Sequence, residues 1–346
     1  GRERRPCGRC GSSSTVTPSA KMRVPSASSR KLVRRVIAGP AMAEVIAREG
    51  ADVVIYDQEF AATVDRALQD TPDVVKILGW VDGDHGDLTT IESLIGNHLG
   101  HRPEPATRKS DIILLTSGTT GTSKAVRCTQ GRLARIAYAA TDKFGHHRGD
   151  VDYCCMPLFH GNALMALWAP ALANGATVCL TPSFSASRFL SDIRYFGATF
   201  FTYVGKALAY LMATPERDDD ADNTLTRGFG TEAPPEDQAE FRRRFGAELF
   251  EGYGSSEGGA VATPDAAAPP TALGRPAHDG VSVVDPETMQ PCPPAVLDPQ
   301  GRVLNGDEAV GEIVDRRGAG DFEGYYRNGA ADAERLRNGW YWSGDL

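Results

Sequence analysis

Short apolar runs alternate with helical patterns along the chain beyond residue 40, and this alternation restricts the fold more than any other feature. Strands are predicted at eight apolar runs, which lie at 51–57, 74–80, 111–115, 151–157, 176–180, 198–204, 247–253 and 281–285. Helical patterns separate several of them, at 42–50, 130–143, 161–173, 185–195 and 234–244. Strands that alternate with helices are typical of a mostly parallel sheet with helices on both faces. We therefore predict an α/β fold of mostly parallel sheets flanked by helices, with a smaller β-rich part near the end.

The length of the chain predicts more than one compact unit. It has 346 residues, more than a single core usually contains, so we expect two lobes or one large domain with an annex. The stretch 262–280 is rich in proline and small residues and is the best candidate for a boundary. The predicted division is a head at 1–40, an α/β core at 41–265 and a β-rich subdomain at 266–346.

Charge is distributed unevenly along the chain. The net charge is −8, yet residues 1–35 hold ten Arg and Lys against the single acid Glu3. The remaining body is therefore acidic and is a poor candidate for binding nucleic acid. The head is rich in Arg and Ser, as transit peptides are, but it has no starting Met and no apolar face. A disordered or unrelated head is the favoured interpretation.

Seven cysteines are scattered over the chain, an odd number that does not suggest a disulfide framework. Cys154 and Cys155 adjoin in an apolar run, which favours a reducing, cytoplasmic location. Cys7 and Cys10 form a lone CxxC pair, so zinc is not expected there. No apolar run reaches the ~18 residues of a membrane span. Peripheral contact with a membrane and the oligomeric state stay open.

The sequence TSGTTGTSK at 116–124 is the strongest candidate for a ligand-binding loop. It follows the apolar run 111–115 and is expected where the end of a parallel strand presents a loop to a ligand. Its glycines let backbone N–H groups converge on an anion, its hydroxyls donate hydrogen bonds, and Lys124 adds positive charge. It is not a Walker A loop, because Ser123 precedes Lys124 and Ala125 follows it. A plain Ser/Thr/Gly loop remains the alternative.

The sequence GFGTEA at 228–233 has the spacing of a dinucleotide-binding glycine motif. Pro234 and Pro235 follow it, where the helix of such a motif should already be under way. We therefore discount dinucleotide binding at this position.

Six motifs occur in order along the chain, and together they carry a resemblance to a known superfamily. They are TSGTTGTSK (116–124), PLFHG (157–161), GFGTEAPPE (228–236), EGYGSSEGG (251–259), GEIV with GYYRN (311–328) and GWYWSGDL (339–346). Over about residues 41–346 the chain resembles the adenylate-forming superfamily of acyl-CoA synthetases and related ligases. The wording at 202–215 and 228–259 is most similar to the fatty acid transport protein and very-long-chain acyl-CoA synthetase branch.

The resemblance implies a fatty-acid–CoA ligase that uses ATP, Mg²⁺ and CoA. A carboxylate attacks the α-phosphate of ATP to give acyl-AMP and pyrophosphate, and the thiol of CoA then displaces AMP. The reaction brings two anions together, so it needs hydrogen-bond donors and cations in the site. The acid is expected to be a fatty acid or another long apolar carboxylate. Two alternatives stay open: an acyl-AMP ligase that feeds a carrier protein, and a non-catalytic nucleotide-binding remnant.

The resemblance also implies roles for single residues in binding phosphate and metal. The catalytic set is Thr120, Lys124, Ser256 and Glu257, of which Ser256 contacts the α-phosphate and Glu257 holds Mg²⁺. The loop expected to bind the β- and γ-phosphates comprises Thr116, Ser117, Gly118, Thr119, Thr120, Gly121 and Lys124. Ser123 and Ser256 stand where the family has proline and threonine. The plainer alternative for Glu257 is a solvated acid in a glycine-rich turn.

The nucleoside and the acyl group have their own expected contacts. The segment expected to line the adenine pocket comprises Gly230, Thr231 and Glu232, while Tyr253, next to Gly254, stacks on adenine. Asp345 is expected to accept hydrogen bonds from both ribose hydroxyls.

On the acyl side, the residues expected to lie beside the substrate are His160, Gly161, Tyr203, Val204 and Gly205. A lone His is often structural, and apolar residues at a strand end are often core, so both plainer alternatives remain.

In the superfamily a hinge and a small C-terminal domain follow the aspartate that Asp345 matches, and more α/β structure precedes the phosphate loop. We therefore expect this sequence to be an incomplete large N-terminal domain, weakly active or inactive alone. The acidic loop 214–223 and the head 1–35 overlap no motif, so we expect both to be dispensable for nucleotide binding.

Overall fold

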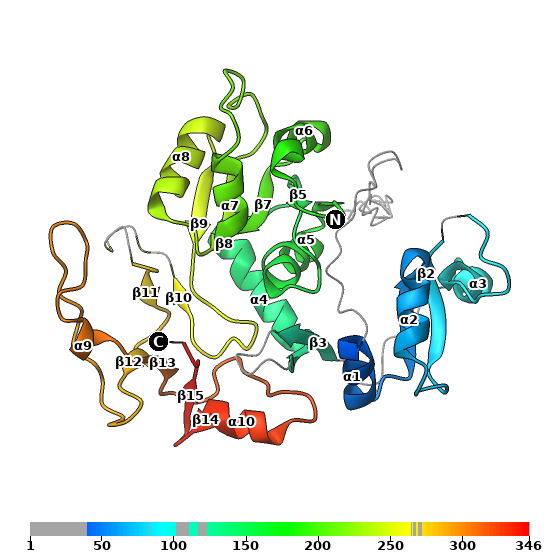
Figure 1. Cartoon of the computed structure of the whole chain (residues 1–346). Helices are drawn as coiled ribbons and strands as arrows, with labels where there is room; N and C mark the ends of the chain where they lie inside the picture. The colour runs from blue at the N-terminus through cyan, green and yellow to red at the C-terminus, as the bar shows by residue number, and fades with distance from the viewer. Residues whose placement is uncertain are drawn as a thin grey trace, which may run out of the picture.

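The computed structural model describes residues 40–81, 83–101, 111–116, 123–263, 265, 268 and 272–345. Figure 1 shows a central body of sheet and helices, a smaller α/β unit that contains the first described residues, and a β-rich part that contains the last. The expectations for the head and for loop residues 117–122 fall outside the described residues.

A five-stranded parallel sheet forms the middle of the central body. Its strands follow the order β6-β5-β7-β8-β9, and every neighbouring pair is parallel. The strands are β5 (Val151–Cys154), β6 (Thr177–Leu180), β7 (Phe200–Val204), β8 (Arg227–Thr231) and β9 (Glu248–Glu251). The parallel α/β architecture predicted from alternating strands and helices is therefore confirmed.

Helices cover both faces of this sheet, as two neighbouring residues of β7 show. Successive side chains of a strand point to opposite faces, so Phe200 and Phe201 contact different helices. Phe201 packs in one core cluster with residues of α6, α7 and α8, whereas Phe200 packs in another with residues of α4 and η4. Both phenylalanines are fully buried, and burial of such a side chain typically contributes about 1.5–3 kcal/mol. The helices are α4 (Gln130–Phe144), the π-helical η4 (Asn162–Trp168), α5 (Ala169–Asn174), α6 (Ala186–Phe196), α7 (Gly205–Met212) and α8 (Pro235–Phe245).

The long helix α4 shows how local sequence sets helix ends. Thr129 caps its first turn, because its Oγ1 accepts the backbone N–H of Arg132 at 3.1 Å. At the other end Gly145 has a φ of 64°, a left-handed conformation that glycine adopts without strain. The helix pattern predicted at 130–143 is confirmed.

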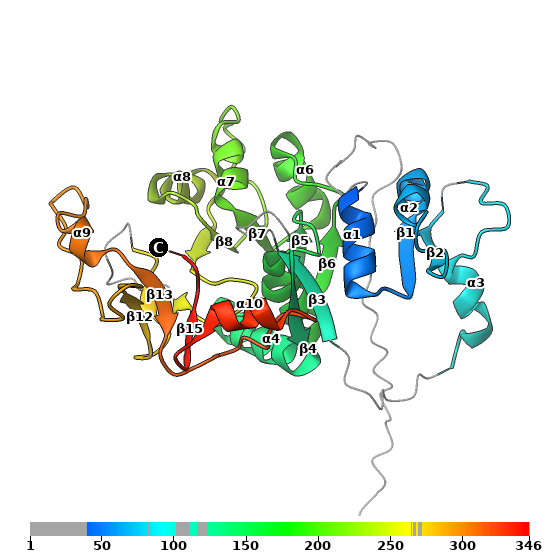
Figure 2. The same ribbon diagram turned by 60° about the horizontal axis from the view of Figure 1, so that its bottom comes forward.

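A separate unit near the start of the described chain has its own small core. Strands β1 (Val53–Asp57) and β2 (Val75–Trp80) pair in parallel. Figure 2 shows them with their helices at one side of the molecule. The helices are α1 (Pro40–Glu49), η2 (Gln58–Phe60), α2 (Ala61–Ala67), α3 (Ile91–Ile95) and η3 (Gly96–His98). The exposed face of the two strands carries Val53, Ile55 and Val75.

The strand before the predicted phosphate loop is not part of the parallel sheet. β3 (Asp111–Thr116) pairs antiparallel with β4 (Lys124–Thr129), and Thr116 lies opposite Lys124. The expectation of a loop at the end of a parallel strand was therefore wrong, since the loop joins the strands of a hairpin. The apolar run predicted β3, whereas β4, with its Lys and Arg, has no such run to reveal it.

The other edge of β4 is occupied by a segment from the end of the chain. The N–H of Tyr326 donates to the carbonyl of Ala125 at 2.7 Å, and the N–H of Arg127 donates to Gly324 at 3.0 Å. Thr129 also donates to the carboxylate of Glu323, at 2.7 Å from its Oγ1. These bonds connect the GYYRN motif to the strand that begins with Lys124.

The β-rich part near the end is confirmed. Four strands form an antiparallel sheet in the order β12-β13-β15-β14. They are β12 (Val281–Val284), β13 (Glu312–Asp315), β14 (Leu336–Arg337) and β15 (Trp340–Trp342), accompanied by helices α9 (Gly306–Ala309) and α10 (Gly329–Arg335). The short strands β10 (Ala262–Thr263) and β11 (Arg275–Pro276) pair antiparallel within the stretch expected to be a boundary.

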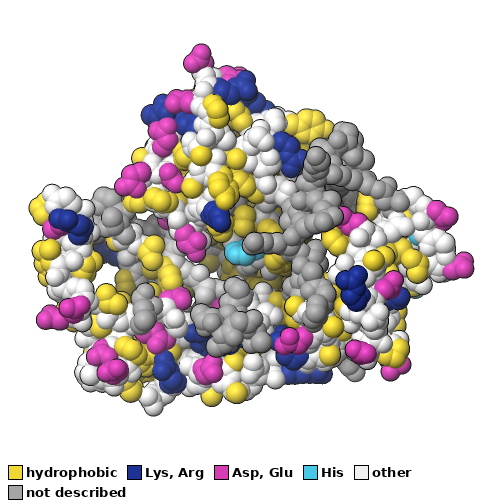
Figure 3. Space-filling view, viewed as in Figure 1, with side chains coloured by type: hydrophobic (Ala, Val, Ile, Leu, Met, Phe, Trp, Pro, Cys, Tyr) yellow, Lys and Arg dark blue, Asp and Glu magenta, His cyan; other side chains and the backbone are white. Residues whose placement is uncertain are grey.

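Two surface properties are plain in the described residues. None of their helices combines the length and the apolarity needed to cross a bilayer. On the face shown in Figure 3, Lys and Arg side chains lie among Asp and Glu side chains rather than gathering in one basic patch.

Candidate functional site

Glu257 is buried beneath residues from the end of the chain. Its side chain is 8% exposed, and Oε1 accepts a hydrogen bond from the hydroxyl of Tyr325 at 2.9 Å. That hydroxyl accepts a bond from Nε of Arg335 at 3.2 Å. Among the described residues no hydrogen bond reaches the second oxygen of Glu257. A carboxylate held by one oxygen, with the other unused, fits the expected role as a ligand of a hard cation.

Lys124 lies beside the same tyrosine. Its Nζ is 3.1 Å from Oε2 of Glu334 and 5.3 Å from the centre of the Tyr325 ring. The lysine side chain is largely buried, with 13% exposed, whereas that of Glu334 is 68% exposed. A salt bridge with so exposed a partner contributes little to stability, so an anionic ligand could replace it. Lys124 and Glu257 thus flank Tyr325.

The structure places Tyr253 next to Asp345, and both residues are expected to contact the nucleoside. The hydroxyl of Tyr253 donates to Oδ2 of Asp345 at 2.6 Å. The backbone around Asp345 is fixed by bonds from its N–H to Oγ of Ser343 and from the N–H of Ile313 to its carbonyl, both at 3.1 Å. The sequence pattern linked these residues through two distant motifs, and the structure brings them together.

Arg132 holds the segment that contains Ser256 in place through a hydrogen bond to its backbone. It is fully buried and donates to the backbone carbonyl of Ser256 at 2.7 Å and to that of Arg127 at 3.0 Å. A Cβ on Gly258 would lie 2.3 Å from its guanidinium, so the glycine is required by close approach as well as by its φ of 75°. Nothing in the sequence pattern singles out Arg132, because its partners are backbone atoms far along the chain.

The expected acyl side adjoins Ser256 through Gly161. A Cβ on Gly161 would lie 2.8 Å from Oγ of Ser256, so a side chain at position 161 would force the Ser256 hydroxyl to move. The next residue, Asn162, donates to the carbonyl of Tyr203 at 3.0 Å and its N–H donates to Nδ1 of His160 at 3.2 Å. The His160 side chain is exposed. Desolvation by surrounding protein lowers its pKa, against the opposite effect of the Glu232 charge.

The ends of β7 and β8 fit together with no spare room. A Cβ on Gly205 would lie 1.9 Å from the carbonyl oxygen of Glu232, and Glu232 itself has a φ of 69°. A φ above zero is uncommon for a residue other than glycine. Val204 lies opposite Thr231 in the β7–β8 register. Residues expected in the adenine pocket therefore abut residues expected in the acyl pocket.

Tyr203 belongs to the core rather than to an open surface. Its side chain is 1% exposed and its hydroxyl donates to Oε1 of Glu251 at 2.6 Å. A Cβ on Gly230 would lie 2.2 Å from its ring, which explains the glycine on β8. The plainer alternative for a strand-end residue therefore describes the Tyr203 side chain, and only its carbonyl faces Asn162.

Part of the predicted phosphate loop lies outside the described residues, namely Ser117, Gly118, Thr119, Thr120 and Gly121. At its ends, Oγ1 of Thr116 donates to the carbonyl of Lys124 at 3.5 Å. A Cβ on Gly254 would meet none of the described residues within 4 Å, so this glycine is not required by close packing against them. Sequence reasoning did not single out Glu334, Tyr325 or Arg335, although Tyr325 lies in the GYYRN motif.

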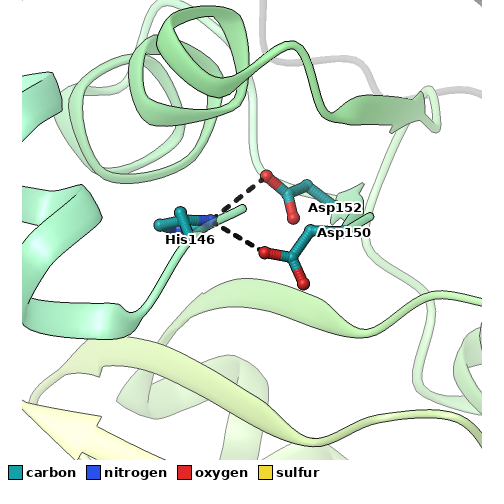
Figure 4. Close-up of side chains that lie close together, drawn as sticks. All are labelled: His146, Asp150 and Asp152. Carbon is teal, nitrogen blue, oxygen red and sulfur yellow. Dashed lines mark ion pairs between the residues drawn. The ribbon is translucent and has the colours of Figure 1, made fainter. Parts of the chain in front are cut away.

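A second cluster of titratable residues lies within the core, away from the predicted site. His146, Asp150 and Asp152 are all buried, and Nδ1 of His146 is 3.8 Å from Asp150 and 3.7 Å from Asp152 (Figure 4). Within the described part of the chain, no other group of three His, Cys, Asp or Glu residues has ligand atoms close enough to share a metal ion. Asp150 already pairs with Arg227 at 2.6 Å and accepts from Thr199 at 2.9 Å. The side chains of His146 and Asp152 form no hydrogen bond with any residue that the structure describes.

Burial acts in opposite directions on this unpartnered pair. It raises the pKa of Asp152 to about 8, with the charge of Asp150 adding to the rise and Arg227 opposing it. It lowers the pKa of His146 to about 4, and the charge of Arg227 contributes to the fall. Both groups are therefore neutral near pH 7, which is the form that burial favours.

We expect Asp152→Asn to remove a loss of stability at neutral to mildly alkaline pH. Between pH 4 and 6.5 the folded pair holds one proton on Asp152 and the unfolded pair holds one on His146, so their effects cancel. From pH 6.5 to 8 the folded state keeps most of the proton on Asp152 while the unfolded state loses what remains of the proton on His146, and the free energy of unfolding falls by roughly 1 kcal/mol. The variant should lack this fall.

Urea unfolding at pH 6.5 and pH 8 measures the difference between wild type and variant. Asp218→Asn is the matched control, because Asp218 is exposed and should leave the fall unchanged. An equal fall in the Asp152→Asn variant and in the wild type would contradict the assignment of the proton to Asp152.

Sequence comparison finds extensive similarity to curated proteins. The chain is 72% identical over 264 residues to the steroid-22-oyl-CoA synthetase of Rhodococcus jostii (strain RHA1), covering 75% of this chain and 48% of the relative. It is 46% identical over 235 residues to the medium/long-chain-fatty-acid–CoA ligase FadD17 of Mycobacterium tuberculosis (strain ATCC 25618 / H37Rv), covering 68% and 44%. The chain thus spans about half the length of these curated relatives.

Solved structures share the fold at lower sequence identity. The anthranilate CoA ligase AuaEII in complex with anthranoyl-AMP matches with a TM-score of 0.72 and 19% identity, over 88% of this chain and 58% of that one. The amide bond synthetase McbA from Marinactinospora thermotolerans matches with a TM-score of 0.65 and 25% identity, over 90% and 60%. The family described as AMP-binding enzyme matches residues 34–326. The chain therefore belongs to the AMP-binding enzyme family, the adenylate-forming superfamily that its six motifs resemble.

Proposed function

We propose that the chain forms the nucleotide- and acyl-binding part of an ATP-dependent acid–thiol ligase, an acyl-CoA synthetase. The observation that carries this proposal is the convergence of Lys124, Glu257 and the Tyr253–Asp345 pair around Tyr325 and Arg335. These side chains come from the hairpin, from the segment after β9 and from the end of the chain. A cation, a carboxylate with an unused oxygen and a ribose-type acceptor are the groups that binding of ATP requires.

In the proposed first half-reaction, a carboxylate oxygen of the acid attacks the α-phosphorus of ATP and pyrophosphate leaves. Lys124 would offset the negative charge of the phosphates, and the hydroxyl of Ser256 would donate a hydrogen bond to the α-phosphate. Arg132 supports this by fixing the backbone at Ser256, so that the hydroxyl needs little reorganisation. The close approach of Gly161, just before η4, to Ser256 supports a position for the acid on the η4 side of Ser256.

The proposed metal is Mg²⁺, which when bound would offset the negative charge of the phosphates. Glu257 would hold it through the oxygen that Tyr325 leaves unused. In the second half-reaction, the sulfur of CoA would attack the acyl carbon and AMP would leave. Tyr253 and Asp345 would keep the nucleoside in place through both steps.

The proposed substrate is a large apolar carboxylic acid. The relative that is 72% identical is named for a steroid-22-oyl group, and the one that is 46% identical for medium and long fatty acids. The higher identity supports a steroid acid before an unbranched fatty acid. His160, Val204 and Gly205 are the residues of this chain that we propose to adjoin it.

Titration with nucleotide and with stable acyl-AMP mimics tests this proposal. We expect saturable binding of ATP in the presence of Mg²⁺, and tighter binding of a sulfamoyl-adenosine that carries a steroid-22-oyl group than of one that carries an acetyl group. A mimic with an unbranched fatty acyl group tests the substrate class separately. Isothermal calorimetry on the 346-residue chain gives each dissociation constant.

Each outcome has a distinct meaning. Equal binding of the steroid and acetyl mimics would contradict a large apolar acid, and preference for the fatty mimic would replace the steroid with a fatty acid. Absence of binding by ATP and by every mimic would overturn the proposed function. Binding without any acyl-AMP formation would favour a non-catalytic nucleotide-binding role for the chain.

A further inference from the structure

Arg335 connects two parts of the proposed nucleotide site that are otherwise held by separate segments. It is the last residue of α10, and its Nε donates to the hydroxyl of Tyr325 at 3.2 Å. One terminal nitrogen donates to the backbone carbonyl of Trp342 at 3.3 Å and also to that of Ser343. Neither the motifs nor the resemblance assigns this arginine a role.

Each acceptor of Arg335 leads to a residue of the proposed site by one further step. Tyr325 donates its own hydroxyl proton to Oε1 of Glu257 at 2.9 Å. Ser343 accepts the N–H of Asp345 at 3.1 Å through its hydroxyl, and Asp345 accepts from Tyr253. The proposed metal ligand and the proposed ribose ligand are therefore both two contacts from one guanidinium.

The geometry requires an arginine rather than any cation. A guanidinium offers N–H donors in a rigid planar fork, so it can satisfy a hydroxyl on one side and carbonyls on the other. A lysine ammonium has one nitrogen and cannot reach both sets at these positions. The guanidinium also packs closely against Gly344, since a Cβ on Gly344 would lie 2.2 Å from it.

The charge of Arg335 suits its surroundings. Glu257 and Tyr325 are both buried, and a buried carboxylate needs hydrogen-bond donors or cations nearby. Arg335 reaches Glu257 only through Tyr325, so it leaves the second carboxylate oxygen unused. A direct salt bridge to Glu257 would instead compete with a bound cation.

We propose that Arg335 is a positioning residue that fixes Glu257, through Tyr325, and the 342–345 segment in one geometry for nucleotide and metal. The proposal rests on the proposed function, because it takes Glu257 and Asp345 as ligands of Mg²⁺ and ribose. It predicts separable effects: the Tyr325 branch governs metal-dependent binding, and the carbonyl branch governs binding of the nucleoside.

The test measures dissociation constants for ATP with Mg²⁺, ATP with EDTA, and AMP with EDTA. Tyr325→Phe should lower the gain in ATP affinity that Mg²⁺ gives by about tenfold, since it removes one hydrogen bond to a charged group. It should change AMP affinity by less than about twofold, because the carbonyl branch is untouched. Arg335→Lys should lower both the Mg²⁺ gain and the AMP affinity, because it loses both branches.

A double variant and a control separate positioning from a general structural role. If Arg335 acts on Glu257 only through Tyr325, the Mg²⁺ gain of Tyr325→Phe/Arg335→Lys should equal that of Tyr325→Phe alone, because no hydroxyl is left through which residue 335 can act. Arg316→Gln removes an exposed arginine from the same β-rich part and should leave all three constants unchanged.

Several results would overturn the proposal. If wild type shows a Mg²⁺ gain and Arg335→Lys matches Arg316→Gln in every constant, the positioning role is wrong and the proposed function stands. If wild type binds no nucleotide, the proposed function fails and the positioning role with it. Should Arg335→Lys not fold, Tyr325→Phe decides alone, because it deletes a single hydroxyl, and an unchanged Mg²⁺ gain in it would refute the proposal.

Discussion

Lys124→Ala and Glu257→Gln are each expected to weaken the binding of ATP with Mg²⁺ more than about tenfold while the fold remains intact. Lys124 is the cation at the start of β4, and loss of a charged partner at a phosphate typically costs about 1.5–3 kcal/mol. Glu257→Gln keeps the shape and an acceptor for Tyr325 but removes the negative charge that a hard cation needs. We attribute the expected loss of affinity to lost contacts with the ligand and not to lost stability, because the Lys124–Glu334 pair is exposed on one side and adds little stability.

Calorimetric titration and thermal unfolding together check this expectation. Lys76→Ala and Glu216→Gln are matched controls, since each loses one ion pair, with Asp65 and with Arg243 respectively, outside the proposed site. The controls should bind ATP with Mg²⁺ as the wild type does. If both site variants also keep wild-type affinity, the assignments of the phosphate lysine and the metal carboxylate are both lost.

Gly205→Ala should destabilise the protein by about 3 kcal/mol or more, in the upper range for overpacking of a core. The added Cβ would lie 1.9 Å from the carbonyl oxygen and 2.4 Å from the carbonyl carbon of Glu232. Both are backbone atoms, so no side chain can rotate away, and the ends of β7 and β8 would have to separate. Glu232 is already held at a φ of 69°, which limits how its backbone can adjust.

Gly329→Ala provides a close control for this substitution. Gly205 and Gly329 are both the first residue of a helix, in α7 and α10, but a Cβ on Gly329 would meet no described residue within 4 Å. The control should be neutral or slightly stabilising, because alanine favours the helix. Urea unfolding gives both changes in free energy, and equal stability of the two variants would show that the β7–β8 junction can relax.

The parts of the fold that could be predicted are those whose signal is local. β5 (VDYC) and β7 (FFTYV) lie in largely apolar runs, as strands buried on both faces usually do, and their positions followed from the sequence. β8 was missed as a strand because its sequence, RGFGT, has two glycines. Phe201 and Tyr203 on β7 require those glycines, because their rings fill the space that a side chain on β8 would need. That requirement lies in the partner strand and is invisible in β8 itself.

The candidate site shows the same limit at longer range. Glu257 and Asp345 lie in motifs that can be read as such, so the sequence pointed to them. Arg132 and Arg335 act on backbone carbonyls of other segments, and any residue has a carbonyl, so no pattern at the acceptor marks them. The antiparallel setting of β3 was also missed, because an apolar run predicts a strand and not the direction of its neighbour.

The seam between β4 and residues 324–326 has a consequence for the unfolded and nascent protein. Lys124 and Glu334 are 210 positions apart, and Thr129 and Glu323 are 194 apart. Contacts of such sequence separation are slow to form, because a long loop must close first. Until they form, one edge of β4 presents unpaired backbone donors and acceptors, which is the kind of edge on which chains aggregate. The segment that completes the proposed nucleotide site therefore also shields a strand edge, so a change that detaches this segment would both weaken nucleotide binding and expose that edge.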